Sequence, residues 1–456
     1  MKPNFGLVRI ELSHLNQHDK RALHDTIDIY RDAVSFLLPV ICDNYSTLAS
    51  KTNYEAMQAV EHMVHKTKEN PFPSYPLFDL LFYKLPSYIR RAAIHDALGQ
   101  AESHQTRCEQ YDAEREKVVT TGRHYKKMMP AFHFHPNACP TLYKGNMFQI
   151  EGKVLKIKIR IRNTWDWICV TMPHRDYKNL MKAQQNGILK NPMLSFAYHK
   201  FYLSFPVAYH CRKMQEQSLE AQTVLAVDQG LNNGAVCSVI DALGNVLARD
   251  FDPFEKERKD MEHIMNLIRK KYRTSGTGQC CSHLYTKLQG MKENYVRQLS
   301  RWVTNLAIRY RVYGIVLEHL EKMKGRKTIA MRLHHWCTAR VRDYIKGMAF
   351  REGIRTFLVN PKGTSLYAYD GSGKVTRNRH NYSLCVFSTG KQYHCDLSAS
   401  YNIGARYFLR AYKKSIPVKE WSQFMAKVPE LAKRTNWTLA TLRKFQIPCP
   451  ETTCTA

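Results

Sequence analysis

The clearest indication of fold in this sequence is residues 223–234, which read TVLAVDQGLNNG. An apolar run of this length before a glycine-containing turn predicts a buried β-strand followed by a tight return. Asp228 stands at the carboxyl end of that strand, where packing does not require an acid. Residues 235–240 and 246–251 read as two further strands, so the segment predicts the start of a sheet.

Apolar strands and amphipathic stretches alternate after this point. Strands are expected at 313–317 and 354–359, and helices at 254–272, 283–313 and 333–351. Such alternation is typical of an α/β domain.

Two further acids occupy positions like that of Asp228. Glu318 ends the run GIVLE at 314–318, and Asp396 opens DLSASYNI at 396–403, a predicted helix whose small residues permit close approach to a strand. If the strands are neighbours, the three carboxylates converge. Such a cluster of like charges requires divalent cations to neutralise it. Carboxylate oxygens are ligands that Mg²⁺ and Mn²⁺ prefer. Each acid also has a structural explanation, as a turn residue, a strand-end surface charge and a helix N-cap respectively.

The whole chain is strongly basic. Its 456 residues include 69 Lys and Arg against 39 Asp and Glu, a net charge of +30, and 44% are hydrophobic. This composition excludes a disordered polymer, a collagen and a small disulfide-rich domain, and it favours a polyanionic partner, nucleic acid first. No apolar run reaches the ~20 residues that span a bilayer, the start does not resemble a secretory signal, and the 13 cysteines are scattered. We therefore expect a cytosolic protein without membrane contact.

The N-terminal half combines strands with a helical block. Residues 5–11 read as a strand, residues 16–125 are mostly helical, and period-two alternation returns at 148–161, with further strands at 166–172 and 198–207. This pattern predicts an antiparallel β module interrupted by helices.

The strand near residue 157 has two contrasting faces. Its inward side chains are expected to be Val154, Ile157, Ile159 and Ile161. Lys156, Lys158 and Arg160 share the other face, either as a solvated surface or as a track for the phosphate backbone.

Three segments together resemble a known nuclease family. VDQG at 227–230, IVLE at 315–318 and DLSASYNI at 396–403 are similar, in this order, to the three motifs of the split RuvC nuclease in the TnpB family and its descendants, the type V CRISPR effectors. The third segment resembles the family pattern Asp-x-Asn-Ala-Ala-x-Asn-Ile, with serine at positions 398 and 400. The resemblance leaves the segment after Tyr412 without a counterpart.

The resemblance implies a multidomain α+β fold. A wedge-like β-barrel at 1–15 and 126–220 would be interrupted by a helical recognition lobe at 16–125. A RuvC-like (RNase H-like) α/β nuclease domain would follow at 221–411, and a basic tail at 412–456.

The implied function is that of an RNA-guided DNA endonuclease. It would bind a guide RNA and target double-stranded DNA and cleave beside a short motif by Mg²⁺-dependent phosphodiester hydrolysis. Asp228, Glu318 and Asp396 would be both the catalytic residues and the metal ligands. The expected nucleic-acid contacts are Arg90, Arg91, Lys156, Lys158, Arg160, Arg377 and Arg379.

The insertion at about 364–395 departs from the family pattern. Family members carry a zinc ribbon with two Cys-x-x-Cys pairs there, whereas Ala368, Gly371 and Ser388 stand where this chain would need thiolates. We therefore expect no zinc, because too few soft ligands remain. Aromatic residues and a buried Cys385 are expected to hold the insertion together.

Two other functions stay open. One is a guide-RNA-dependent DNA-binding protein or repressor that has lost cleavage, although retention of all three carboxylates argues against it. The other is a guide-independent RuvC-like transposase or resolvase, against which the large basic N-terminal half is evidence. Oligomeric state and the target-adjacent motif cannot be read from the sequence.

Overall fold

A computed structural model of the chain separates into two compact units, Met1–His210 and Cys211–Ala456. The structure describes residues 4–446 except 123, 133, 136, 198, 215, 231–233, 276–280, 320–328, 379–380 and 382, with the backbone alone at 4, 275 and 329–336. In the described part of the chain, no helix is long and apolar enough to cross a membrane.

The first unit contains two antiparallel sheets. One consists of β1 (Asn4–Glu11), β7 (Lys200–Tyr209), β5 (Gly187–Leu189) and β6 (Met193–Ala197), the last two paired to different parts of β7. The other consists of β2 (Phe148–Glu151), β3 (Val154–Ile161) and β4 (Thr164–Thr171). The rings of Phe148 and Phe205 lie 5.7 Å apart, so the two sheets share one core. Closure of these strands into a barrel stays a prediction.

Strand β3 shows how alternation sets the two faces of its sheet. Leu155, Ile157 and Ile159 are fully buried, which confirms the prediction for the two isoleucines. The prediction for Val154 is wrong: this residue is half-buried, because strict alternation from Ile157 places Leu155 inward instead. Ile161, at the strand end, is half-buried against the same core.

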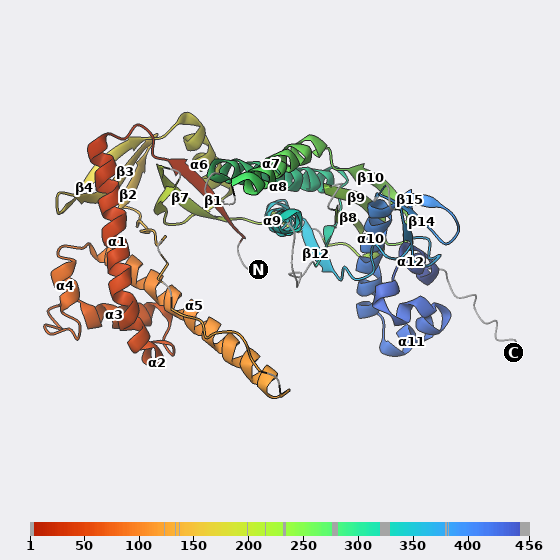
Figure 1. Cartoon of the computed structure of the whole chain (residues 1–456), viewed down its shortest axis with the longest axis horizontal. Coiled ribbons are helices and arrows are strands. Elements are labelled where there is room, and N and C mark those ends of the chain that lie inside the picture. The colour runs from red at the N-terminus through yellow and green to blue at the C-terminus, as the bar shows by residue number, and fades with distance from the viewer. Residues whose placement is uncertain are drawn as a thin grey trace. The chain divides into compact units, whose positions relative to one another are not determined.

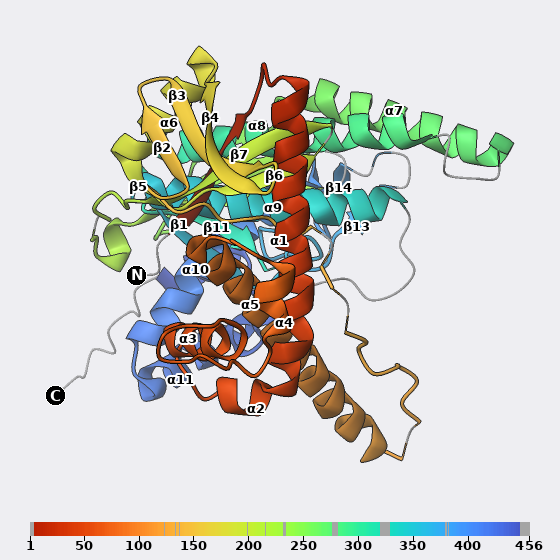
Figure 2. The ribbon, with the colours of Figure 1, turned by 90° about the vertical axis from the view of Figure 1, so that its left-hand side faces the viewer.

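A block of helices separates β1 from β2. It consists of α1 (Gln17–Asp43), α2 (Tyr45–Leu48), α3 (Asn53–Val64), α4 (Leu77–Leu81) and α5 (Ser87–Val119), and α6 (His174–Asn186) follows β4. The long helices α1 and α5 cross one another (Figure 2). At this crossing the buried Tyr30 hydroxyl donates to the Ala92 carbonyl at 3.1 Å. Helix α3 begins with a capping box, in which Thr52 and Glu55 satisfy each other's backbone N–H groups.

The second unit is built on a mixed five-stranded sheet in the order β10–β9–β8–β11–β12. These strands are β8 (Thr223–Gly230), β9 (Gly234–Asp241), β10 (Val246–Phe251), β11 (Gly314–Glu318) and β12 (Arg355–Val359). β8, β11 and β12 are parallel, whereas β9 is antiparallel to both of its neighbours. The strands predicted from the sequence are therefore confirmed, and the fold is mixed α+β.

Helices cover both faces of this sheet. The layer that packs on Leu225 and Val227 consists of α7 (Glu255–Ser275), α8 (Ser282–Arg309) and α9 (Ile329–Arg351). The layer that packs on Val224 and Ala226 consists of α10 (Cys395–Ser415), α11 (Val418–Lys427) and α12 (Leu439–Gln446). Figure 1 shows α10 beside β8 and β9. Because strand side chains alternate, even-numbered residues of β8 face α10.

A small antiparallel sheet lies in the chain between β12 and α10. It consists of β13 (Thr376–Arg377), β14 (Leu384–Val386) and β15 (Gln392–His394). Since β15 ends where α10 begins, this sheet is joined directly to the helix that carries Asp396.

Candidate active site at the carboxyl ends of β8 and β11

Asp228 and Glu318 occupy equivalent positions on neighbouring parallel strands. Val227 of β8 lies opposite Leu317 of β11, so an acid is the next residue on each strand. Both acids have the parity of Ala226, which faces α10. Asp228 is only 7% exposed. The strand register thus brings two carboxyl groups from distant parts of the sequence to one edge of the sheet.

Asp396 reaches the same edge from the first turn of α10. The N-cap of this helix is His394, whose Nδ1 accepts from the Leu397 N–H at 3.3 Å. The alternative explanation of Asp396 as the helix N-cap is therefore wrong. A Cβ built on Gly230, the last residue of β8, would lie 3.0 Å from Asp396 Oδ2. The carboxylate therefore lies against the end of β8, in the first turn of α10.

Small residues on α10 permit this approach. A Cβ added to Gly404 would lie 2.6 Å from the Ile240 side chain and 3.3 Å from that of Ala226. Ser398 and Ser400 are buried on the same helix. The prediction that small residues bring this helix close to a strand is confirmed.

The electrostatics of Asp228 show that the three carboxyl groups interact. Burial raises the pKa of Asp228 well above its usual range, and the charges of Glu318 and Asp396 raise it further. Arg377 and the Gln229 N–H oppose this rise in pKa. Because ionised carboxylates repel each other in a buried site, this carboxylate cluster is stable at neutral pH only with a proton or a cation between them.

Glu318 is held by two groups that favour its ionised form. Burial raises its pKa, whereas the Thr364 hydroxyl, which donates to Oε1 at 2.6 Å, and the Arg406 charge both lower it. Thr364 is 3% exposed, so its hydrogen bond to Glu318 is shielded from water.

Arg406 is a buried cation behind Glu318. Its guanidinium donates to four backbone carbonyls: Nε to Trp437, Nη1 to Asn360 and Lys362, and Nη2 to Thr435, at 2.7 to 3.2 Å. Burial lowers its pKa to about 10, which leaves it charged at neutral pH. These bonds join α10 both to the loop after β12 and to the segment before α12.

Asn402 makes a parallel set of contacts one turn earlier on α10. Its Nδ2 donates to the carbonyls of Thr364 at 3.0 Å and Tyr367 at 2.9 Å, and its Oδ1 accepts from the Leu439 N–H at 3.1 Å. Sequence analysis did not identify Thr364, Asn402 or Arg406 as site residues. The available signal was the spacing of 402 and 406, which places two polar residues on one face of a largely apolar helix.

The carboxylate cluster offers the hard oxygen ligands that Mg²⁺ and Mn²⁺ prefer. Nevertheless, within the described ranges, no three Asp, Glu, His or Cys side chains lie close enough together to hold one ion between them. The carboxylates are thus neighbours that repel each other, and each ion would be held by fewer than three of them in this arrangement. The chemistry of the donors fits the implied metal.

Arg377 on β13 is the basic residue that the structure brings to the carboxylates, since its charge lowers the pKa of Asp228. Its side chain is exposed. Arg379, predicted to bind nucleic acid with it, lies outside the described residues.

A thiol cluster of Cys385, Cys395, Ala368 and Phe387 forms the core of the small sheet. Burial and, to a smaller extent, the neighbouring Cys395 raise the pKa of the Cys385 thiol to about 12. The rings of Tyr369, Phe387 and Tyr393 surround the thiols with centroids 5.0 to 5.8 Å apart. The expected burial of Cys385 among aromatic residues is confirmed. Tyr382, which was also expected among them, lies outside the described residues.

The predicted basic residues of the first unit differ in their surroundings. Arg90 is 7% exposed and donates through Nε and Nη2 to Glu61 Oε1, while the more exposed Arg91 donates to Glu61 Oε2. This geometry favours a structural role for Arg90.

The basic row on β3 is half-buried and so more accessible than Arg90. Lys156 pairs with Glu151 at 2.7 Å, Lys158 lies over the Trp167 ring, and Arg160 donates to Asn163 at 2.7 Å. The three side chains share the face opposite Ile157, as predicted.

A hollow of about 540 Å³ lies at the ends of β11 and β12. His319, which follows Glu318 directly, lines it together with Asn360, Pro361 and Arg410. Arg410 donates to the Leu358 carbonyl at 3.0 Å, which holds its guanidinium at the rim. The hollow therefore has the Arg410 cation in its lining and begins one residue after Glu318.

Residues 7–162 match the model of the Aq_aa04 family. No curated protein matches the chain. Among solved structures, the chain is similar to CasPhi-2 (Cas12j) bound to crRNA, with 11% identity and a TM-score of 0.49 over 90% of this chain and 98% of that one. It is also similar to the mini-RNA-guided endonuclease CRISPR-Cas_phi3, with 10% identity and a TM-score of 0.48 over 88% of this chain and 92% of that one.

A further similar structure is the Cas12f1–sgRNA–target DNA complex, with 12% identity and a TM-score of 0.32 over 88% of this chain and 98% of that one. These proteins are compact type V CRISPR effectors, the group that the three motifs resemble. TM-scores below 0.5 do not establish a common fold, so the function is inferred below from this chain's own residues.

Proposed function

We propose that this chain is an RNA-guided DNA endonuclease in which Asp228, Glu318 and Asp396 hold Mg²⁺ or Mn²⁺. The observation that carries the proposal is the position of the three acids at one edge of a mixed sheet, with Asp228 and Glu318 on neighbouring parallel strands and Asp396 against Gly230. The ordered motifs that contain these acids and the net charge of +30 support it.

Each residue of the site has a role in this proposal. Bound Mg²⁺ would activate water and stabilise the leaving oxygen of the cleaved phosphodiester. Thr364 fixes the orientation of Glu318, and Arg406 opposes the rise in its pKa that burial causes, which favours the form that binds a cation. Arg377 and Arg410 supply positive charge for the phosphate backbone of the substrate.

The remaining assignments follow the resemblance. Residues 221–411 would be the RuvC-like nuclease domain, residues 16–125 the recognition lobe, and the sheets of the first unit the wedge. Lys156, Lys158, Arg160 and Arg91 would contact phosphates of the guide RNA or its duplex with DNA.

A guide-dependent DNA-binding protein without cleavage is the second candidate. It is favoured by the finding that, among the described side chains, no three potential ligands lie close enough to hold one ion. The two candidates differ in a single measurement, because only an endonuclease cuts bound target DNA when Mg²⁺ is supplied.

The test uses the full chain with the RNA that co-purifies with it and a matching DNA target. Asp228→Ala, Glu318→Ala and Asp396→Ala should each reduce Mg²⁺-dependent cleavage more than about a hundredfold, since loss of a second-shell group alone costs that much at metal sites. Target binding should be retained. Asp260→Ala, at an exposed position on α7, is the matched control and should cleave normally.

Two results would contradict the proposal in different ways. Wild-type protein that binds its target but does not cut it with Mg²⁺ or Mn²⁺ would favour the binding protein. Cleavage at the wild-type rate by all three carboxylate variants would show that the active site lies elsewhere.

A further inference from the structure

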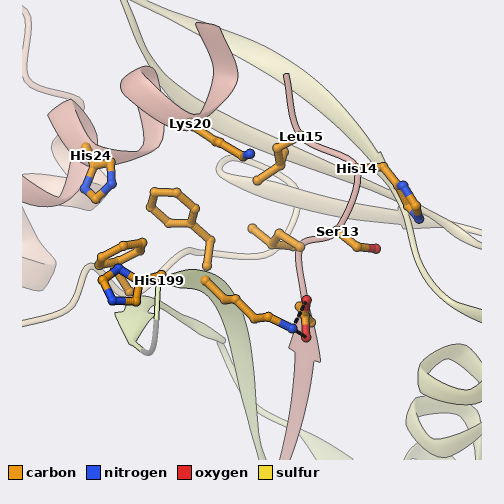
Figure 3. A pocket seen from close by; sticks show the side chains of 11 residues that line it. Ser13, His14, Leu15, Lys20, His24 and His199 are labelled. Atoms are coloured by element: carbon orange, nitrogen blue, oxygen red, sulfur yellow. Dashed lines mark hydrogen bonds and ion pairs between the residues drawn. The ribbon is translucent and has the colours of Figure 1, made fainter. Parts of the chain in front are cut away.

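A second hollow, of about 460 Å³, lies within the first unit and has no role in the proposed chemistry. It lies between the end of β1, the first turns of α1 and the turn that joins β6 to β7. In Figure 3, His24 and His199 lie on one side of it, and the Lys20 amine extends across toward Leu15. Its volume suits one small ligand and is too small for a duplex.

One wall of this pocket is aromatic. The His24 ring lies edge-on to Phe196 and Phe201, with centroids 4.4 and 4.7 Å away, and the two phenylalanines are 4.8 Å apart. Phe201 is 3% exposed and anchors the group, whereas Phe196 is 37% exposed. A fixed ring with an accessible surface is the kind of platform on which nucleic-acid bases stack.

The pocket also carries available positive charge. Lys20, in the first turn of the 27-residue helix α1, is exposed and makes no ion pair with any described residue. Lys200, by contrast, is held by Glu11 at 2.8 Å, so that pair is already neutralised. The N-terminus of α1 adds positive potential near Lys20.

Two histidines of the pocket have unusual backbone conformations. His14 has φ 61° and His199 has φ 60°, both in the left-handed region that side chains other than glycine rarely adopt. Such strain persists only where surrounding structure enforces it, and it is concentrated at ligand sites. The His199 imidazole lies on the same side of the pocket as His24 (Figure 3).

We propose that this pocket binds a single unpaired nucleotide of the guide RNA, with its base against Phe196 and its phosphate at Lys20 and His199. Aromatic rings beside an unpaired cation match a nucleotide, which joins a flat base to a phosphate. RNA is the favoured source because the unstacked bases of its loops and bulges are the usual targets of aromatic stacking in proteins. Only this choice of source rests on the proposed function.

The first experiment measures binding of adenosine monophosphate and of inorganic phosphate to full-length Asp228→Ala protein from which RNA has been removed. Lys20→Gln and Phe196→Ala should each weaken nucleotide binding about tenfold, the usual effect of losing a stacking or phosphate contact. His199→Asn should weaken it too without disturbing the fold, because asparagine tolerates the left-handed conformation. Arg21→Gln, one residue along α1 and outside the pocket, is the matched control.

The second experiment uses guide RNA that contains 4-thiouridine, followed by ultraviolet cross-linking and peptide identification. Cross-links to the peptide that contains Phe196, abolished by Phe196→Ala, are expected. Nucleotide binding unchanged in both Lys20→Gln and Phe196→Ala, or inorganic phosphate that competes as well as the nucleotide, would overturn the pocket assignment. Nucleotide binding without any RNA cross-link would overturn the guide RNA as its source. Neither readout requires cleavage, so failure here is distinct from failure of the endonuclease proposal.

Discussion

The carboxylate cluster and the thiol cluster of the second unit lie one residue apart in sequence at Cys395 and Asp396, yet burial has opposite consequences for them. Burial raises the pKa of both Asp228 and Cys385. For a thiol, this shift reinforces the neutral form that already dominates at pH 7, so Cys385 packs as an apolar side chain. For a carboxyl group, it opposes the form that dominates at pH 7, so the cluster requires compensation. The comparison separates a cluster whose groups carry charge that burial opposes at pH 7 from one whose groups are neutral there.

The largest effect is expected at Arg406, the buried cation whose charge acts on Glu318. Arg406→Met should destabilise the protein by about 3–5 kcal/mol, because it removes the donor to four backbone carbonyls and the buried cation near Glu318. Urea unfolding measures this change. Arg410→Met is the control, since that exposed side chain bonds to only one carbonyl.

The same residue gives a pH test. The Arg406 charge lowers the pKa of Glu318, so loss of this charge should raise that pKa. The acid limb of the plot of cleavage rate against pH should then move to higher pH. Arg406→Lys keeps the charge and should leave the limb in place even if the protein is less stable. An unmoved limb in a folded Arg406→Met protein would contradict the electrostatic role.

A smaller effect is expected in the thiol cluster. Cys385→Ser should cost about 1–3 kcal/mol, because it places a hydroxyl in an apolar site, whereas Cys42→Ser at an exposed position should change stability by less than about 0.5 kcal/mol. A zinc-selective chelator should leave the melting temperature of the wild type unchanged. Stoichiometric zinc in the purified protein would show that these cysteines are ligands after all.

The smallest effect has the opposite sign. Asp228→Asn should stabilise the metal-free protein at neutral pH, because burial and the neighbouring carboxylates disfavour the charge that the variant removes. The folded pKa of Asp228 is raised, so its contribution to stability is present below the ordinary aspartate pKa and is lost as pH rises through the folded value. The gain in the variant should therefore appear above about pH 4 and vanish below it.

Added Mg²⁺ sharpens this prediction. It should raise the melting temperature of the wild type and not that of Asp228→Asn, because only the wild type has the full charge cluster to bind it. Asp228→Asn that melts below the wild type without metal would show that the carboxylates are not in conflict.

Local pattern was sufficient for much of the fold. The apolar runs before Asp228 and Glu318 predicted two strands that end in acids, and the small residues after Asp396 predicted a closely packed helix; the structure has all three. These features could be predicted because the periodicity of a strand or helix depends on residues that are consecutive in the sequence. The error at Val154 has a local origin, since this apolar residue lies three positions before Ile157 and so breaks the period of two that the isoleucines follow.

Contacts between distant segments could not be predicted. Thr364 reaches Glu318 across 46 residues, and Arg406 bonds to carbonyls at both 360 and 435, which no local pattern encodes. Arg90 was predicted to contact nucleic acid from the resemblance, and its ion pair with Glu61, which depends on the packing of α3 on α5, could not be anticipated from local sequence. Sequence analysis therefore identified the acids and missed the groups that control their charge.

The bonds from α10 to residues 435–439 also affect the order of events during synthesis. The ribosome makes every carboxylate of the cluster before Thr435 and Trp437, whose carbonyls accept from Arg406, and before Leu439, which donates to Asn402. Until those residues emerge, the helix that carries Asp396 has two polar side chains without their final partners. A nascent chain thus cannot complete the second unit strand by strand as it leaves the ribosome, and the carboxylate edge is assembled only after most of translation is over.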